Sequence, residues 1–247
     1  MPAGTRTRIR KVTDAVRNLR PDVVHAHSSW AGIYARLART DVPVVYQPHC
    51  FGFVNPGVPA AQRVAANVAE RLLAYRTAAI LAVSPYERDL ARRISWPAGT
   101  HVAMIPNRPG VEQRAPAPGV GAHPVVTMIG RLTAQKDPLY FADVARRVRA
   151  RGLGVRFRWI GGGTEPAYRE ALQAAGVEVT GWLGQEEMIR ELRASDLYLH
   201  SAAAEGFPIS VLDAAASGLP VVVRDIVAFS GLPLTGADDA EDAARHV

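Results

Sequence analysis

Two acidic side chains in one short segment are the first feature of this sequence that could do chemistry. Glu205 stands in the glycine-containing stretch 201–208, and Asp213 follows within a run of small apolar residues. Pro208 suits the first turn of a helix and Gly218 its end, so we expect Asp213 inside a helix. A carboxylate there costs free energy unless it has a partner. We therefore predict that both acids face one site and accept hydrogen bonds from hydroxyl groups. The alternative is one helix-terminal acid and one solvated acid.

A pair of basic side chains follows an expected strand at residues 125–129. Gly130 ends the strand, and Arg131 and Lys136 come before the next expected helix. Ligands of open parallel sheets bind at the carboxyl ends of strands, where two cations suit a diphosphate. The alternative is a pair of solvated surface cations.

Three consecutive glycines, residues 161–163, lie between another expected strand and a helix with Pro166 in its first turn. Glycine lets backbone N–H groups approach a phosphate, and a helix N-terminus adds partial positive charge. Because tight strand-to-helix turns also use glycine for its positive φ, a purely structural role stays open.

The elements that must position these residues alternate along the chain. Short β-branched runs predict strands at 23–24, 42–45, 79–83, 102–105, 125–129, 155–160, 177–180, 197–199 and 221–223. Amphipathic stretches predict helices at 31–39, 60–75, 86–93, 140–150, 168–174 and 186–194. This alternation is typical of parallel α/β layers. We predict an α/β fold of two Rossmann-like lobes, at residues 1–110 and 124–247, with a Pro/Gly-rich linker at 111–123 and a ligand between the lobes.

Charge is distributed unevenly over the 247 residues. Residues 1–121 hold 16 Lys+Arg and 7 Asp+Glu, a net charge of +9, whereas residues 122–247 hold 13 and 16, a net charge of −3. A basic lobe attracts nucleic acid, anionic lipid or phosphorylated small molecules. We predict no nucleic-acid partner, because no basic stripe is interleaved with aromatic residues. The single cysteine, and the lack of an apolar run long enough to span a bilayer, favour a cytoplasmic protein.

The sequence offers few candidate metal ligands. His25 and His27 share one face of an expected strand, but no third ligand accompanies them, and no Cys/His cluster or E-x-x-H pattern occurs. We therefore predict no metal site and no cofactor.

Taken together, these segments resemble the family 4 (group 1) glycosyltransferases. The resemblance rests on the order and spacing of Gly130-Arg131…Lys136, the three glycines, and Glu205-Gly206-Phe207-Pro208…Asp213. Upstream, residues 20–27 resemble an R-P-D-V-V-H-x-H stretch, residues 44–49 a strand ending in a loop histidine, and residues 105–107 a hinge between lobes. The resemblance implies a GT-B fold and a retaining enzyme that moves a sugar from a nucleotide-diphospho-sugar to a glycan or lipid-linked acceptor.

The resemblance also implies roles for individual residues. The catalytic residues would be His49, at the reacting centre, and Glu205, which would contact hydroxyls of the transferred sugar. The donor-binding residues would be Arg131 and Lys136 at the diphosphate, Asp213 at the ribose, Leu183 within the nucleobase segment 180–184, and Gly161, Gly162, Gly206, Phe207 and Pro208. For His49, the alternative is a structural bond to a loop carbonyl.

Two departures from the family pattern affect these expectations. The family has E-x7-E where this chain has E-x7-D, so the ribose contact of Asp213 can lengthen or pass through water. Family members also begin with further strands and a Gly-Gly loop and end with closing helices, which predicts a truncated form with an incomplete N-terminal lobe. The alternative function is accordingly a non-catalytic nucleotide-sugar-binding module or an inactive fragment.

Basic residues of the first lobe suggest a membrane partner. They are Arg6, Arg8, Arg10, Lys11, Arg17 and Arg20 near the start, and Arg63, Arg71 and Arg76 along the expected helix 60–75. In the family that this chain resembles, such lobes often sit on membranes that hold lipid-linked acceptors, which predicts peripheral docking on anionic headgroups. The alternative is a solvated arginine-rich face.

Overall fold

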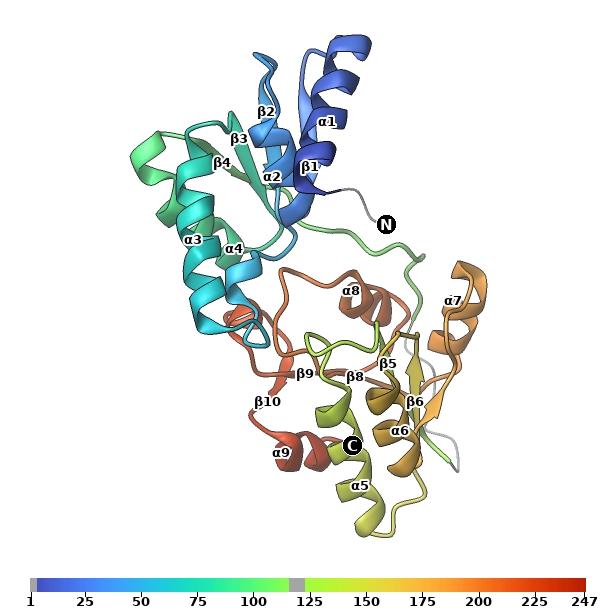
Figure 1. Cartoon of the computed structure of the whole chain (residues 1–247). Helices are drawn as coiled ribbons and strands as arrows, with labels where there is room; N and C mark the ends of the chain where they lie inside the picture. Colours follow the sequence, from blue (N-terminus) through green and yellow to red (C-terminus); the bar gives the residue numbers. More distant parts are fainter. Residues whose placement is uncertain (1–3, 116–122) are drawn as a thin grey trace. The chain divides into compact units, whose positions relative to one another are not determined.

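The computed structural model describes residues 4–115 and 123–247 and divides into two compact units (Figure 1). Unit 1 comprises Met1–Asn107 with Ala204–Phe207, and unit 2 comprises Arg108–Ala203 with Pro208–Val247. Residues 116–122, which belong to the predicted linker, lie outside the described residues, as do residues 1–3.

Unit 1 is built on a parallel sheet of four strands in the order β1-β2-β3-β4. The strands are β1 (Val24–His27), β2 (Val44–Gln47), β3 (Ala79–Ala82) and β4 (His101–Met104). The helices are α1 (Thr5–Leu19), α2 (Ser29–Leu37), α3 (Ala60–Ala74) and α4 (Pro85–Ser95), with short 3-10 turns η1 (Gly52–Val54) and η2 (Trp96–Ala98).

Helix α1 is absent from the predicted elements. Its apolar residues Ile9, Val12, Val16 and Leu19 recur at helical spacing, but they form a narrow stripe among many arginines. Only Thr13 and Val16 of this helix are buried, and it packs against α2. A helix with so little apolar surface gives a weak periodic signal, which explains why it was missed.

Unit 1 encloses small apolar clusters and a buried polar group. The main cluster includes Tyr46, Phe51 and Ile80. Beside it, the buried Arg36 pairs with Glu70 at 2.7 Å, and the Arg36 guanidinium lies 3.9 Å from the centre of the Tyr46 ring. The Tyr46 hydroxyl donates to the second oxygen of Glu70 at 3.2 Å. A charged pair therefore joins α2 and α3 inside this unit.

Unit 2 is built on a parallel sheet of six strands in the order β10-β9-β8-β5-β6-β7. The strands are β5 (Val125–Ile129), β6 (Arg156–Ile160), β7 (Glu178–Val179), β8 (Leu197–His200), β9 (Val221–Arg224) and β10 (Thr235–Ala237). The helices are α5 (Pro138–Ala150), α6 (Pro166–Ala174), α7 (Gln185–Arg193), α8 (Ile209–Ala216) and α9 (Ala240–Arg245), with a 3-10 turn η3 (Val227–Phe229).

The order of these strands reverses beside β5, which pairs with β6 on one edge and with β8 on the other. Right-handed crossovers then place α5 and α6 on one face and α8 on the other. Figure 1 shows α5 beside α6 and α9, and α8 on the opposite side near β8 and β9. Between these layers lies one apolar cluster that includes Met128, Phe141, Trp159, Leu172 and Tyr198.

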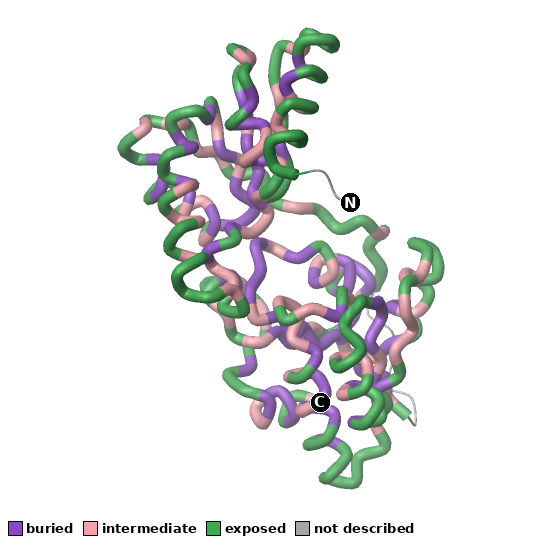
Figure 2. The backbone as a smooth tube through the Cα atoms, viewed as in Figure 1, coloured by how far each residue is buried: buried purple, intermediate pink, exposed green. Residues whose placement is uncertain are grey.

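Buried residues follow the strands of both units and the inward faces of their helices (Figure 2). Within the described part of the chain, no helix is both long enough and apolar enough to cross a bilayer. Helix α8 begins at Ile209, so Pro208, which was predicted in its first turn, is instead its N-cap. Gly218 follows the end of the helix at a φ of 82°. Strand β10 and helix α9 were not predicted.

Candidate functional site

Five of the predicted donor-binding residues of unit 2 lie in the loops after the carboxyl ends of β5, β6 and β7. Ligands of open α/β sheets bind where the strand order reverses, and here that point lies between β5 and β8. The loops that leave these strands carry Arg131 and Lys136 after β5, Gly161 and Gly162 after β6, and Leu183 after β7.

The loop after β5 carries both predicted cations. Arg131 is exposed, and the stem of Lys136 lies along Gly130, with Cγ 3.2 Å from the place a Gly130 side chain would occupy. A larger residue at position 130 would therefore displace the lysine. Asp137 ends the loop as the N-cap of α5, and its side chain accepts from Tyr140 N and pairs with Arg224 at 2.6 Å.

Two hydrogen bonds tie this loop to the segment after β8. The Ser201 hydroxyl donates to the carbonyl of Lys136 at 2.7 Å, and Ala203 N donates to the carbonyl of Gln135 at 2.9 Å. Ser201 is fully buried. One side-chain bond and one backbone bond thus hold together the two loops that flank the strand-order reversal, which fixes the backbone of the loop that carries Arg131 and Lys136.

The glycine loop after β6 packs directly on the loop after β5. Leu132 N donates to the carbonyl of Gly162 at 2.9 Å, and the Trp159 indole donates to the carbonyl of Gly130 at 2.8 Å. Gly161 has a φ of 136°, and a Cβ there would overlap the Gly130 carbonyl. Glycine is therefore required at position 161 by both conformation and space, and a structural role accounts for it without a ligand.

The loop after β7 completes this group. Gly161 forms an isolated bridge with Gly181, and the half-buried Leu183 follows. The Trp182 indole is 70% exposed, yet it covers Gly162, with Nε1 3.0 Å from where a Cβ would lie. Trp182 is not among the predicted site residues. An aromatic residue between Gly181 and Gly184, inside the predicted nucleobase segment 180–184, was the signal that could have found it.

Asp213 lies within α8, as expected, and is 6% exposed. Its Oδ1 accepts a hydrogen bond of 2.6 Å from the backbone N–H of Gly110. Burial raises the pKa of Asp213, and this hydrogen bond lowers it again by a smaller amount. A buried carboxylate needs a hydrogen-bond partner, and for Asp213 this partner is the backbone N–H of Gly110. It bonds to one of the two carboxylate oxygens.

The segment Ala204–Phe207 passes beside the loop that follows β2, within unit 1. A Cβ on Gly206 would overlap the carbonyl oxygen of His49, so glycine lets the two backbones meet. Asn107 donates its side-chain N–H to the carbonyl of Phe207 at 2.6 Å. Glu205 is 8% exposed. The two predicted catalytic residues, His49 and Glu205, therefore lie on adjoining segments.

Three imidazole rings gather at the carboxyl ends of β1 and β2. His27 Nδ1 and His49 Nε2 are 2.8 Å apart, and the ring centres of His25 and His27 are 4.0 Å apart. His49 adopts a φ of 58°, rare for a residue with a side chain. Burial lowers the pKa of His49, and the charges of His27 and His25 lower it further. Two neutral rings, one donating and one accepting, fit this geometry.

The geometry of this cluster shows which partner the His49 ring has, and whether the histidines belong to a set of metal ligands. The described partner of the His49 ring is His27 rather than a loop carbonyl. Across residues 4–115 and 123–247, no group of three or more His, Cys, Asp or Glu side chains is arranged to hold a metal ion.

Family models match nearly the whole chain. Residues 1–108 match a family described as "Glycosyl transferase 4-like domain", and residues 123–245 match "Glycosyl transferases group 1".

Curated relatives agree with this assignment. The chain is 28% identical to the Escherichia coli UDP-Gal:alpha-D-GlcNAc-diphosphoundecaprenol alpha-1,3-galactosyltransferase, with 83% of this chain and 58% of the relative covered. It is 30% identical to a GDP-mannose-dependent alpha-mannosyltransferase of Mycobacterium tuberculosis, with 91% and 60% covered. The chain thus spans about 60% of the length of the relatives it matches.

Solved structures share the fold. Sucrose-phosphate synthase from Thermosynechococcus elongatus superposes with a TM-score of 0.76 at 17% identity, covering 96% of this chain and 66% of the other. Anabaena HepE in complex with UDP and glucose superposes with a TM-score of 0.72 at 19% identity, covering 96% and 70%. The likeness confirms the predicted α/β fold of the GT-B type.

Proposed function

Because the chain belongs to the group 1 glycosyltransferases, we propose that it transfers a sugar from a nucleotide-diphospho-sugar to a glycan or lipid-linked acceptor. Transfer proceeds with retention of configuration at the sugar. The named relatives use UDP- and GDP-linked sugars, and one acts on a diphosphoundecaprenol-linked acceptor, which supports this substrate class.

One observation carries the proposal. The loop that bears Arg131 and Lys136 is hydrogen-bonded through Lys136 and Gln135 to the segment after β8, at the point where the strand order of unit 2 reverses. A diphosphate bound there meets two cations and the backbone amides of the loops after β5 and β6. Since these two hydrogen bonds fix the backbone of the loop, its groups need little reorganisation when negative charge develops.

The proposed reaction breaks the bond between the anomeric carbon and the diphosphate and forms a bond from that carbon to an acceptor oxygen on the same face. The acceptor proton passes to an oxygen of the departing phosphate. Arg131 and Lys136 stabilise the leaving nucleoside diphosphate, so the proposal requires no resident metal or cofactor. Glu205 accepts hydrogen bonds from hydroxyls of the transferred sugar and is not the nucleophile.

The remaining predicted residues take supporting roles in this proposal. His49, kept neutral by burial and its histidine neighbours, lies near the transferred sugar. Asp213 reaches the ribose with its Oδ2, since its Oδ1 is bonded to Gly110. Trp182 and Leu183 lie along the nucleobase, beside Gly162.

We place the reaction at the cytoplasmic face of a membrane. The net charge of +9 on residues 1–121 supports peripheral contact with anionic headgroups, near a lipid-linked acceptor.

Loss of the two cations tests the donor site. Arg131→Ala combined with Lys136→Ala should weaken binding of UDP or GDP at least roughly tenfold, because charge-assisted phosphate contacts contribute about 1.5–3 kcal/mol each. Arg146→Ala with Arg190→Ala is the matched control, since both are exposed helix arginines of unit 2 beside an acid. Calorimetric titration measures both. Equal binding by wild type and the Arg131/Lys136 variant would overturn the assignment.

Donor hydrolysis separates a catalyst from the alternative, a non-catalytic binding module. A panel of UDP- and GDP-sugars first identifies the ligand that raises the melting temperature, since a specific ligand stabilises by mass action. That donor should then slowly release nucleoside diphosphate with wild type and more slowly with Glu205→Ala. Binding without any release would favour the module.

A further inference from the structure

Helix α3 carries apolar side chains on the face that points away from the core of unit 1. Val64 is 64% exposed, Val68 49%, Leu72 66% and Tyr75, the C-cap residue, 65%. Their spacing of four, four and three residues places them along one side of the helix. We call these four residues the α3 stripe.

The opposite side of the same helix is buried. Glu70, Leu73 and Ala74 face the interior, where Glu70 meets Arg36 and Tyr46. Helix α3 therefore has two apolar faces, whereas a surface helix of a soluble protein ordinarily has one. A contiguous exposed apolar surface with a polar border marks an interaction site.

The border of the α3 stripe is basic. Arg71 is exposed beside Leu72, where it bonds the Asn67 side chain at 3.0 Å and the carbonyl of Arg93 on α4. Arg76 follows Tyr75 and is also exposed. The only acid within α3 is Glu70, and it is buried and paired. The exposed surface of this helix thus combines apolar and positive groups, which are complementary to a surface that is apolar and negative.

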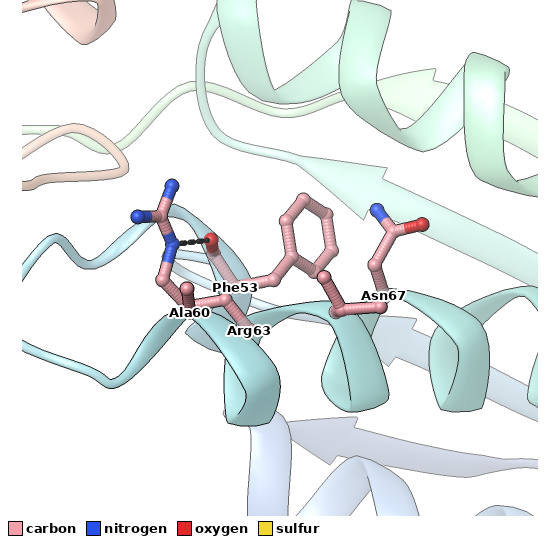
Figure 3. A pocket seen from close by; sticks show the side chains of 5 residues that line it. Phe53, Ala60, Arg63 and Asn67 are labelled. Atoms are coloured by element: carbon pink, nitrogen blue, oxygen red, sulfur yellow. Dashed lines mark hydrogen bonds between the residues drawn. The ribbon is translucent and has the colours of Figure 1, made fainter.

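A groove opens at the N-terminal end of the stripe. It has a volume of about 310 Å³ and is lined by Phe53, Ala60, Arg63, Val64 and Asn67. Figure 3 shows the Phe53 ring above α3, between the side chains of Arg63 and Asn67, with Arg63 Nε donating to the carbonyl of Phe53 at 3.0 Å. Val64 belongs to both the groove and the stripe, so the apolar surface continues from one into the other.

We propose that this surface, the α3 stripe with Arg71 and Arg76, docks unit 1 on an anionic lipid bilayer. The apolar side chains enter the boundary between headgroups and acyl chains, and the two arginines meet lipid phosphates. The inference rests on the proposed transfer to a lipid-linked acceptor and identifies the surface that brings the protein to it. Helix α1 is more basic, but Leu19 is its one strongly exposed large apolar residue among those described, so it offers charge without an apolar face.

A second copy of the chain fits the stripe less well than a bilayer does. Pairing two α3 helices would bring Arg71 and Arg76 of both copies to one interface with no exposed acid on either helix, and like charges there repel. Anionic lipid supplies the missing negative charge.

Flotation with vesicles of phosphatidylcholine, with and without phosphatidylglycerol, tests the proposal. Wild type should float with the phosphatidylglycerol vesicles and much less with phosphatidylcholine alone. Val68→Gln with Leu72→Gln should lower the apparent affinity at least roughly tenfold, because two apolar side chains no longer enter the lipid. Arg71→Gln should lower it about fivefold, since one basic residue at an anionic surface contributes about 1 kcal/mol.

The matched control is Leu139→Gln with Leu153→Gln, which replaces two leucines of unit 2 that are 50% and 48% exposed. This control should float like wild type. The proposal is overturned if the Val68/Leu72 variant floats like wild type, or if wild type binds both vesicles equally or neither. A dimer that only this variant dissociates, detected by light scattering, would instead assign the stripe to a second copy. Vesicle binding needs no donor, so retained flotation with no UDP or GDP binding would contradict the proposed function alone.

Discussion

The two units of this chain reach a similar α/β architecture by different means. Unit 2 packs its helices on six strands around one apolar cluster, and its strand order reverses beside β5. Unit 1 has four strands in sequential order, smaller clusters and a buried pair, Arg36 and Glu70. A single well-packed core fixes the loops at the ends of its strands, which in the proposed function hold a diphosphate. A smaller core leaves more surface, and unit 1 uses it for the histidine cluster and the α3 stripe.

Removing a large core side chain should test how far unit 2 depends on its one cluster. Trp159 is fully buried and also holds the Gly130 carbonyl. Trp159→Ala should lower the free energy of unfolding by about 3–5 kcal/mol through loss of contacts and the cavity that remains. Trp159→Phe keeps most of the volume and loses the indole bond, so it should cost only about 1–2 kcal/mol. Urea unfolding measures the free energy of unfolding of both variants. Equal losses would contradict the dependence of unit 2 on this apolar cluster.

Breaking the buried pair of unit 1 should lower the free energy of unfolding almost as much. Glu70→Leu leaves the Arg36 charge buried without its partner, which should cost about 3 kcal/mol. Adding Arg36→Met removes the stranded charge and should recover most of that loss. If the double variant is no more stable than Glu70→Leu, then packing rather than the ion pair determines the stability of this region.

A buried acid gives unit 1 a stability that depends on pH. Glu87 is 1% exposed, accepts from Val83 N at 2.8 Å, and burial raises its pKa from 4.5 to about 7. The folded state therefore holds this proton over a range where the unfolded state has lost it, so stability is full below 4.5 and falls as the pH rises through 7. The fall should be about 3 kcal/mol. Urea denaturation at several pH values should show that the free energy of unfolding of Glu87→Gln changes less across this range than that of wild type.

Two glycines in the loops of unit 2 should respond differently to alanine. Gly161 combines a φ of 136° with a clash against the Gly130 carbonyl, whereas Gly181, at a φ of 76°, has open space around its Cα. Gly181→Ala should cost about 1 kcal/mol of backbone strain, and Gly161→Ala about 1–2 kcal/mol more. Gly161→Ala should also weaken UDP or GDP binding. Equal melting temperatures for the two variants would contradict the close packing of these loops.

The histidine cluster should give the smallest effect, and with the opposite pH dependence to Glu87. Burial lowers the pKa of His27 and His49 below 6.5, so the unfolded state binds protons more readily. Stability from these rings is full above 6.5 and falls as the pH drops below it. With His27→Gln, the free energy of unfolding should fall less steeply as the pH drops below 6.5. The loss of stability near pH 7 that Glu87 causes should stay unchanged. If the melting temperatures of wild type and variant fall equally below pH 6.5, that result would count against the pairing of His27 with His49.

Sequence reasoning located most elements and misplaced few, and the misses share a cause. The predicted helix 60–75 agrees with α3, and the predicted strand 125–129 agrees with β5. Helix α1, strand β10 and helix α9 were missed because they are short or carry a narrow apolar stripe, so their periodic signal is weak. The predicted roles of the donor-site and catalytic residues stay predictions, and the experiments above test them.

What the sequence determined by itself is local: alternating strands and helices, glycines where a backbone needs positive φ, and the order of the acidic, basic and glycine-rich segments. The tertiary structure alone decided that Ser201 holds the Lys136 loop, that Trp182 covers Gly162, that Gly110 is the partner of Asp213, and that His27 meets His49. These contacts join residues far apart in the chain. They depend on how strands are ordered and crossovers run, and a pattern within a single segment does not encode that information.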